Sequence, residues 1–213
     1  MPDIEQYYEE YWDDPESYND PTTPQRQALL KRHVKDVSSD SKVLDVGCGR
    51  GEFCRFFAET YGCETLGIDL SKRGIAYAQK QHPDLEFMAV PADALLPDYA
   101  GYFDLVFSSE VIEHLFDVGG YLKAIHGLLK PGGSFVLTTP YHGLIKNVLI
   151  DLKNYSGHYD PEGQHIRFFD TKGLTGCLRR YGFHVETLTG YGRPWPLWKS
   201  FFVVARREDG IGG

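Results

Sequence analysis

The sequence lacks a strong positive charge, cysteines at zinc-binding spacing and any long apolar run. Its 213 residues carry 22 Lys and Arg against 30 Asp and Glu, for a net charge of −8, whereas binding a nucleic-acid backbone requires a basic face. Its four cysteines are too few for a disulfide scaffold, which favours a reduced, cytoplasmic protein. No apolar stretch reaches the length of a membrane span, and no secretion signal is visible. We therefore expect neither a nucleic-acid partner nor a transmembrane segment.

Short apolar runs and helical patterns alternate regularly through the middle of the chain. Expected strands cover 43–46, 65–68, 85–90, 103–107 and 134–138, and the expected helices between them cover 51–61, a stretch from Ser71 through Gln81, and 121–129. Strands separated by helices of this length are typical of a doubly wound parallel sheet. Two further β-rich runs, 183–189 and 198–205, predict an antiparallel pair at the sheet edge. The sequence thus predicts a single α/β domain over 1–213 with a mostly parallel seven-stranded sheet.

Two segments depart from this alternation. Residues 1–40 comprise an acidic, tyrosine-rich arm, which could dock on the fold or form a lid, followed by a helix expected from Gln25 to about Val37. Residues 141–168 form an insertion before a final helix expected over 171–181. Five apolar residues of the insertion at helical spacing predict a helix packed on the core rather than a surface anchor. They are Leu144, Ile145, Val148, Leu149 and Leu152.

The most informative stretch is the glycine cluster after the first expected strand. Gly47, Gly49 and Gly51 follow an acid, Asp45, in a G-x-G-x-G pattern that is tighter than the dinucleotide-binding spacing. Glycine is needed where a Cβ would block both a tight turn and the approach of a ligand. The pattern therefore predicts a backbone turn lying directly against a bound ligand.

Polar residues follow the next three expected strands. Asp69 ends the second strand, Asp93 follows the third, and Ser109 and Glu110 follow the fourth. Because ligands bind outside the carboxyl ends of parallel strands, we expect these residues to line one site. A carboxylate at Asp69 can accept hydrogen bonds from both hydroxyls of a ribose, and Asp93 can accept one from an exocyclic amine.

The stretch from Asp45 to Gly49 resembles motif I of the class I S-adenosylmethionine-dependent methyltransferases. Within that superfamily, residues 45–49, 109–114, 139–140 and 165–169 are most similar to the ubiquinone-type O-methyltransferases. The resemblance implies a Rossmann-like fold, S-adenosylmethionine as cofactor, and cofactor contacts from Arg26, Gly47, Asp69 and Ser109. A guanidinium such as that of Arg26 can bind the methionine carboxylate in a bidentate manner. The full set of candidate cofactor-binding residues is Arg26, Asp45, Gly47, Cys48, Gly49, Asp69, Leu70, Asp93, Ser109 and Glu110.

Glu110, Glu113 and His114 are the first candidates for activating an acceptor hydroxyl. At spacing i, i+3 and i+4 they would share one helix face, and oxygen ligands plus one imidazole suit magnesium or manganese. The resemblance implies the same three residues as metal ligands, and such a cation lowers the pKa of a bound hydroxyl. In the alternative interpretation, Glu110 touches the cofactor while Glu113 and His114 bond to nearby backbone.

Histidines near the insertion are the second candidates, because an imidazole titrates near neutrality and suits a general base. His165 is favoured by its place in the His-Ile-Arg-Phe-Phe stretch, and His142 and His114 complete the catalytic candidates. His158 lies in the same segment.

The predicted activity is methyl transfer to a small-molecule hydroxyl, such as that of a phenol, a quinone precursor or a sugar. The alternatives are N- or C-methylation, or a protein that binds the cofactor without catalysis. The arm, the insertion and the 191–198 link should build the acceptor pocket, with aromatic walls. Peripheral membrane contact through the insertion is disfavoured, because only Lys146 and Lys153 flank its apolar stripe and Asp151 interrupts it.

Overall fold

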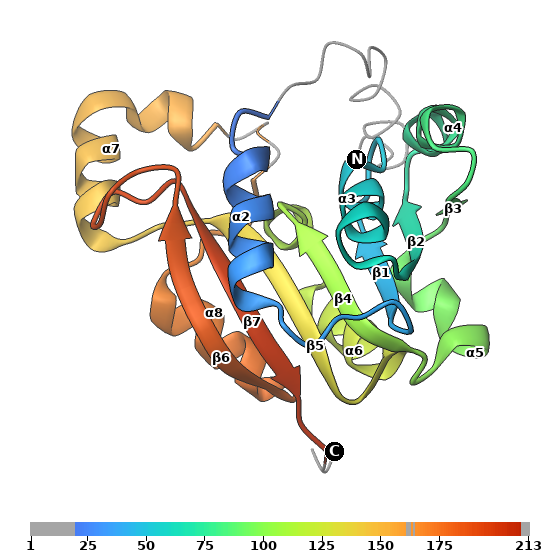
Figure 1. Cartoon of the computed structure of the whole chain (residues 1–213). Helices are drawn as coiled ribbons and strands as arrows, with labels where there is room; N and C mark the ends of the chain where they lie inside the picture. The colour runs from blue at the N-terminus through green and yellow to red at the C-terminus, as the bar shows by residue number, and fades with distance from the viewer. Residues whose placement is uncertain (1–19, 161–162, 164, 210–213) are drawn as a thin grey trace.

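A seven-stranded sheet with helices on both faces organises the computed structural model, which describes residues 20–160, 163 and 165–209 (Figure 1). The strand order is β3-β2-β1-β4-β5-β7-β6. Neighbouring strands pair in parallel from β3 to β5, while β7 is antiparallel to both β5 and β6. This confirms the predicted doubly wound, mostly parallel sheet and its C-terminal antiparallel pair. The strands are β1 (Lys42–Val46), β2 (Glu64–Asp69), β3 (Glu86–Ala89), β4 (Phe103–Ser109), β5 (Leu129–Pro140), β6 (Phe183–Tyr191) and β7 (Ser200–Arg207).

Two core layers lie on the two faces of the sheet, because successive strand residues point to opposite sides. On one face, α2 (Thr23–His33) and α3 (Glu52–Tyr61) pack residues such as Leu30 and Phe57 against Val43. On the other face, α6 (Val118–Leu128) and α8 (Thr171–Arg180) contribute to a second cluster around Leu44 and Val46. The remaining helical elements are α4 (Lys72–Gln81), η1 (Ala92–Leu95), α5 (Leu96–Tyr99), η2 (Ile112–His114) and α7 (Leu144–His158).

Two helix boundaries differ from the sequence prediction by three residues or more, for local reasons. Helix α2 ends at His33 instead of Val37, because Val34 adopts an extended backbone (φ −98°, ψ 102°) and is buried in the core. Helix α6 begins three residues earlier than expected, because the Asp117 side chain caps it by accepting a hydrogen bond from the backbone N–H of Gly120.

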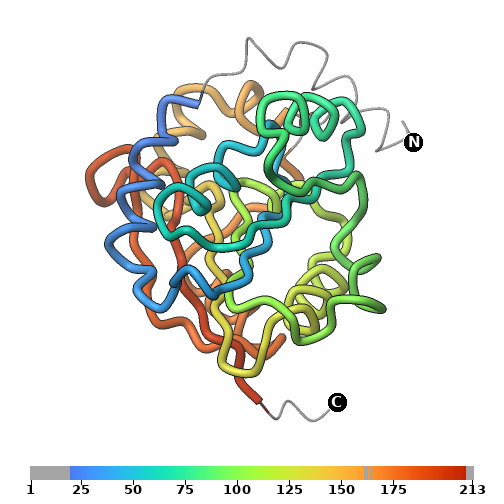
Figure 2. Tube along the Cα trace, turned by 45° about the vertical axis from the view of Figure 1, so that its right-hand side comes forward, coloured from blue at the N-terminus to red at the C-terminus, as the bar shows by residue number. Residues whose placement is uncertain are grey.

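The insertion helix forms as predicted, but its predicted packing on the core is wrong. Helix α7 has no buried residue, its backbone is kinked at Asn154, and its apolar side chains face outward, with Leu144 80% and Leu152 79% exposed. Both views place α7 at the edge where the parallel strands end (Figure 1 and Figure 2). None of the helices in the described ranges has the length and apolar character needed to cross a bilayer. The arm at residues 1–19 lies outside the described residues, so its docking or lid role stays a prediction.

Candidate active site

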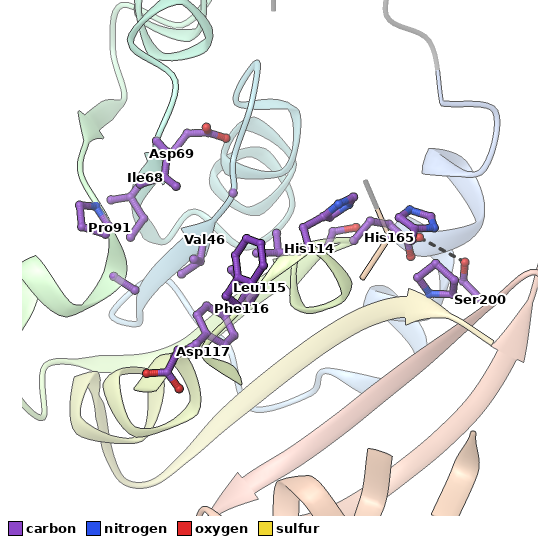
Figure 3. A pocket seen from close by; sticks show the side chains of 18 of the residues that line it. Val46, Ile68, Asp69, Pro91, His114, Leu115, Phe116, Asp117, His165 and Ser200 are labelled. Carbon is purple, nitrogen blue, oxygen red and sulfur yellow. Dashed lines mark hydrogen bonds between the residues drawn. The ribbon is translucent and has the colours of Figure 1, made fainter. Parts of the chain in front are cut away.

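A cavity of about 860 Å³ lies at the carboxyl ends of the central strands. The chain winds outward from β1 through β2 to β3 on one side and from β4 to β5 on the other, so the order reverses between β1 and β4. Ligands of open parallel sheets bind at this reversal. Figure 3 shows Asp69 and Pro91 on one side of the cavity, and His165 and Ser200 on the other.

The glycine turn after β1 forms part of the cavity wall. Gly47 has a φ of +74°, and a Cβ added to it would lie 2.4 Å from Cγ2 of Val111, so no other residue fits without displacement. The N–H groups of Gly47 and Cys48 both donate to the carbonyl of Ile68, at 2.8 and 3.0 Å, which ties the turn to β2. Gly47 lines the cavity.

Asp45, Cys48 and Gly49 do not line the cavity, although Cys48 and Gly49 belong to the turn itself. Asp45 is buried, and its carboxylate accepts a hydrogen bond from the thiol of Cys54 at 3.6 Å. Burial is the main reason that the pKa of Asp45 is raised to about 7, and the nearby charge of Asp69 adds to the effect. In this arrangement Asp45 packs behind the turn and contacts Cys54 of α3.

The predicted nucleotide side of the cavity is assembled around the end of β2. The carboxylate of Asp69 accepts hydrogen bonds from the N–H of Gly49 at 3.0 Å and of Ser71 at 2.9 Å, which fixes its orientation. Asp69, Leu70 and Asp93 all line the cavity. Their roles toward a ribose and an adenine remain predictions that this placement supports.

Arg26 reaches the cavity wall from α2. It is 4% exposed, and its guanidinium donates to Ser109 Oγ at 2.5 Å and to the Asp20 carboxylate at 2.6 Å. Burial opposes the ionisation of Asp20, but hydrogen bonds from Thr22 and the charge of Arg26 outweigh it, so the pKa of Asp20 is lowered. Asp20 was not singled out in the sequence, although it lies only six residues before Arg26, because it belongs to no motif.

The expectation that residues 110–114 share one α-helix face is wrong. Glu110 has a φ of +56°, a left-handed conformation that is unusual for any residue other than glycine, and only a short 3₁₀ turn, η2, follows it. The Glu110 carboxylate instead accepts hydrogen bonds from the hydroxyls of Tyr191 at 3.1 Å and Ser200 at 3.4 Å. Glu110 lines the cavity but is engaged by β6 and β7.

A second histidine, rather than Glu110, lies beside Glu113 and His114 in the group that could hold a metal ion. Ligand atoms of Glu113, His114 and His165 all lie within 4.8 Å of one another. The backbone carbonyl of Glu113 accepts hydrogen bonds from the N–H groups of Ile166 and Arg167, both at 3.0 Å, and this contact brings the insertion to η2. A carboxylate oxygen with two imidazole nitrogens is a donor set that suits a divalent cation.

The carboxyl group of Glu113 is the buried centre of this set. One oxygen accepts a hydrogen bond from Thr139 Oγ1 at 3.0 Å, while the other, Oε1, has no hydrogen-bond partner within the described part of the chain. Burial, followed by the charge of Glu110, raises the pKa of Glu113 well above its ordinary value. A buried carboxyl oxygen without a partner is costly unless a proton or a cation satisfies it, so the residues present fit a bound cation.

The candidate bases His142 and His165 both line the cavity. Burial lowers the pKa of each to about 4; the charge of Lys146 adds to the effect on His142, and that of His114 to the effect on His165. Both imidazoles are therefore neutral at pH 7, with an unprotonated nitrogen but weak basicity. His158 completes the group, with its ring centroid 5.4 Å from that of His142.

A family model described as a methyltransferase domain matches residues 23–188, from the start of α2 into β6. The chain is a class I S-adenosylmethionine-dependent methyltransferase. This confirms the activity class and cofactor implied by motif I, whereas the role of each site residue remains a prediction.

Relatives of known name resemble the methyltransferase over most of its length. A "Ubiquinone biosynthesis O-methyltransferase" of Acinetobacter baylyi is 31% identical over 190 residues, covering 85% of this chain and 78% of the relative. A protein of the same name from Chromobacterium violaceum is 30% identical over 176 residues, covering 79% and 75%.

Solved methyltransferase structures share the fold. An S-adenosylmethionine-dependent methyltransferase of Mesorhizobium loti aligns with a TM-score of 0.67 at 24% identity, covering 84% of this chain and 96% of that one. The 1,6-didemethyltoxoflavin-N1-methyltransferase of Burkholderia thailandensis, solved with S-adenosylhomocysteine bound, aligns with a TM-score of 0.68 at 23% identity, covering 96% and 84%.

Within the described residues, the acceptor half of the methyltransferase's cavity has fewer Phe, Tyr and Trp side chains than predicted, while the predicted contribution of the arm lies outside them. The insertion and the 191–198 link do line the cavity, but they contribute imidazoles and basic side chains instead of phenyl, phenol or indole rings. Tyr141 is buried in the core, and Trp195 is 70% exposed and lies outside the cavity wall. Two aromatic residues that sequence reasoning missed, Phe116 and Tyr121, line the cavity; they follow β4, as Ser109 does.

Proposed function

We propose that the methyltransferase transfers the methyl group of S-adenosylmethionine to a hydroxyl oxygen of a small molecule. The observation that carries this proposal is the cluster of Glu113, His114 and His165 beside the cavity, across from Asp69. A hydroxyl must lose its proton to be methylated, whereas proton removal is less critical for a nitrogen or carbon nucleophile. A cluster that can acidify a hydroxyl or accept its proton therefore favours O-methylation. The names of the relatives from Acinetobacter and Chromobacterium, both O-methyltransferases, support the same reaction.

The cofactor would lie along the β1–β4 side of the cavity. Arg26 would bind the methionine carboxylate, Asp69 would accept from the ribose hydroxyls, and Asp93 would accept from the adenine amine. Gly47 would allow the turn to approach the methionine portion. This orientation directs the methyl group toward the half of the cavity that contains the histidines.

The reaction is an in-line displacement for which the protein supplies alignment. The acceptor oxygen would bond to the methyl carbon while the carbon–sulfur bond breaks, leaving the neutral thioether of S-adenosylhomocysteine, and the hydroxyl proton would pass to solvent water. With a pKa of about 4, His165 alone is a weak acceptor for that proton at pH 7.

Glu113, His114 and His165 would hold a divalent cation; a carboxylate with two imidazoles suits a transition-metal ion such as manganese better than magnesium, which prefers oxygen ligands. Such a cation, when bound, lowers the pKa of a coordinated hydroxyl. Within this arrangement Thr139 orients the Glu113 carboxylate by its hydrogen bond, and the backbone contacts of Ile166 and Arg167 keep His165 near it. Glu110 would lie beside the cofactor, outside the ligand set.

The test is transfer of labelled methyl from S-adenosylmethionine into a small-molecule extract, with and without chelator, for wild type, Glu113→Gln and His165→Ala. His184→Ala, on an exposed residue of β6, is the control. We expect a product that is lost with chelator, is restored by magnesium or manganese, and is strongly reduced in both site variants. A product that is insensitive to chelator but lost in His165→Ala would indicate a histidine base. A product unaffected by either treatment would refute the role given to the cluster.

A further inference from the structure

Basic side chains gather in the acceptor half of the cavity, although the whole chain has a net charge of −8. Lys146 reaches the cavity from α7, Arg193 from the link between β6 and β7, and Lys199 from the residue before β7. These three residues are distant in sequence, and the fold brings them to one wall. Lys199 directly precedes Ser200, which Figure 3 shows across the cavity from Asp69, and Lys146 donates a hydrogen bond to the carbonyl of Lys199.

Lys146 is fixed in place by the backbone. Its ammonium donates hydrogen bonds to the carbonyl oxygens of Tyr141 at 2.5 Å and of Lys199 at 3.1 Å. Burial is the main cause that lowers the pKa of Lys146 to about 8, and the neighbouring charges of Arg193 and Lys199 lower it further. Three cationic groups therefore lie close enough to repel one another.

The carboxylates of the cavity do not pair with this basic group. Asp20 attracts Lys199, but its ion pair is with Arg26. Glu110 attracts Lys146 but accepts its hydrogen bonds from hydroxyl groups.

The other acids of the wall are on the far side of the cavity, where Figure 3 shows Asp69 and Asp117. The side chains of Arg193 and Lys199 form no hydrogen bond or ion pair with any residue of the described ranges. Three cations at one cavity wall, none of which forms a salt bridge with a carboxylate of the described residues, are the arrangement expected of an anion site.

We propose that the methyl acceptor carries an anionic oxygen group, a carboxylate or a phosphate, which Lys146, Arg193 and Lys199 bind. The acceptor's hydroxyl would then point toward His165 and the methyl group. This inference rests on the proposed function, since it takes the histidine side of the cavity as the place of the acceptor. It replaces the expectation of a mainly aromatic pocket with recognition by charge.

The test measures binding without turnover. Benzoate, phenyl phosphate and the neutral benzamide are titrated calorimetrically into protein saturated with S-adenosylhomocysteine, so that Arg26 is not available as an alternative anion site. The variants are Lys199→Gln and Arg193→Gln, which remove exposed charges whose side chains form no hydrogen bond or ion pair with the described residues. Lys153→Gln is the matched control, because Lys153 lies on the same helix as Lys146 but outside the cavity wall.

We expect at least one of the two anions to bind at least about tenfold more tightly than benzamide, since a charge-assisted hydrogen bond contributes about that factor. Lys199→Gln and Arg193→Gln should each weaken the binding of that anion by about tenfold, and Lys153→Gln should leave its affinity unchanged. Added salt should weaken the binding of the anion but not that of benzamide. Tighter binding of phenyl phosphate would identify a phosphate acceptor, and tighter binding of benzoate would identify a carboxylate acceptor.

Three results would overturn the inference: no anion binding, equal binding of benzoate, phenyl phosphate and benzamide, or anion affinity that both variants leave unchanged. Because the titration needs no methyl transfer, its failure is distinct from failure of the proposed function. Anion binding that depends on Lys199, together with a product methylated on nitrogen or carbon, would retain the anion site and reject O-methylation.

Discussion

Replacing Asp45 with Asn should change how the stability of the methyltransferase depends on pH. Asp45 lies buried beneath the glycine turn, and its pKa is raised from an ordinary 3.8 to about 7, chiefly by burial. Between these pH values the folded protein holds a proton that the unfolded chain releases. The free energy of unfolding therefore falls as pH rises from about 4 to 7.

The size of this effect follows from the same two values. One pKa unit is worth about 1.4 kcal/mol, so a change from 3.8 to about 7 corresponds to about 4 kcal/mol of stability lost across this range. Asparagine has nearly the same shape, can still accept from the thiol of Cys54, and does not titrate. Other buried acids also contribute to the pH dependence of wild type, so the informative quantity is the difference between the two proteins.

The assay is urea unfolding without cofactor at intervals from pH 4 to 8. Relative to wild type, Asp45→Asn should gain stability as pH rises, by up to about 4 kcal/mol, and the difference should level off above pH 7. Asp84→Asn is the control: hydrogen bonds from Arg55 lower the pKa of Asp84, so its titration affects stability only below about pH 4, and its curve should run parallel to that of wild type over this range. Parallel curves for wild type and Asp45→Asn would refute the assignment of a protonated Asp45.

Further substitutions test the turn and the packing. Gly47→Ala should weaken the binding of S-adenosylhomocysteine about tenfold, measured by calorimetry, because the added Cβ meets Val111 and the φ of Gly47 is positive. Adding Val111→Ala should restore only part of the lost affinity. Full affinity in the single variant would contradict the geometry. Leu174→Ala, at a fully buried position, should cost about 2–5 kcal/mol in urea unfolding. Leu152→Ala, on the exposed face of α7, should stay within about 0.5 kcal/mol of wild type. A large loss for Leu152→Ala would mean that this face is covered.

The parts of the site that depend on local sequence could be predicted. A strand followed by glycines specifies a tight turn wherever it occurs, and in a sheet whose connections are short and regular Asp69 ends β2 and Asp93 follows β3. The helical spacing in the insertion correctly predicted α7. Periodicity reports which side of a helix is apolar but not what covers it, so the packing of α7 was wrongly predicted.

The parts that depend on where distant segments return could not be predicted. The sequence spacing predicted that Glu110 shares a site with Glu113 and His114. In the structure, the left-handed backbone of Glu110 turns its carboxylate toward β6 and β7. His165 reaches Glu113 only because the insertion pairs with a backbone carbonyl of η2. The three basic residues of the proposed anion site, Lys146, Arg193 and Lys199, could not be predicted for the same reason. They form no sequence motif, and only the folded chain brings them to one wall of the cavity.

The identity of the methylated atom tests the central claim most directly. S-adenosylmethionine labelled with ¹³C in its methyl group is incubated with the methyltransferase and a small-molecule extract, and the product is analysed by NMR. The account predicts a labelled methyl group on an oxygen atom, in a molecule that also carries a carboxylate or a phosphate. A labelled methyl group on nitrogen or carbon, or no transfer by protein that binds S-adenosylhomocysteine, would contradict it.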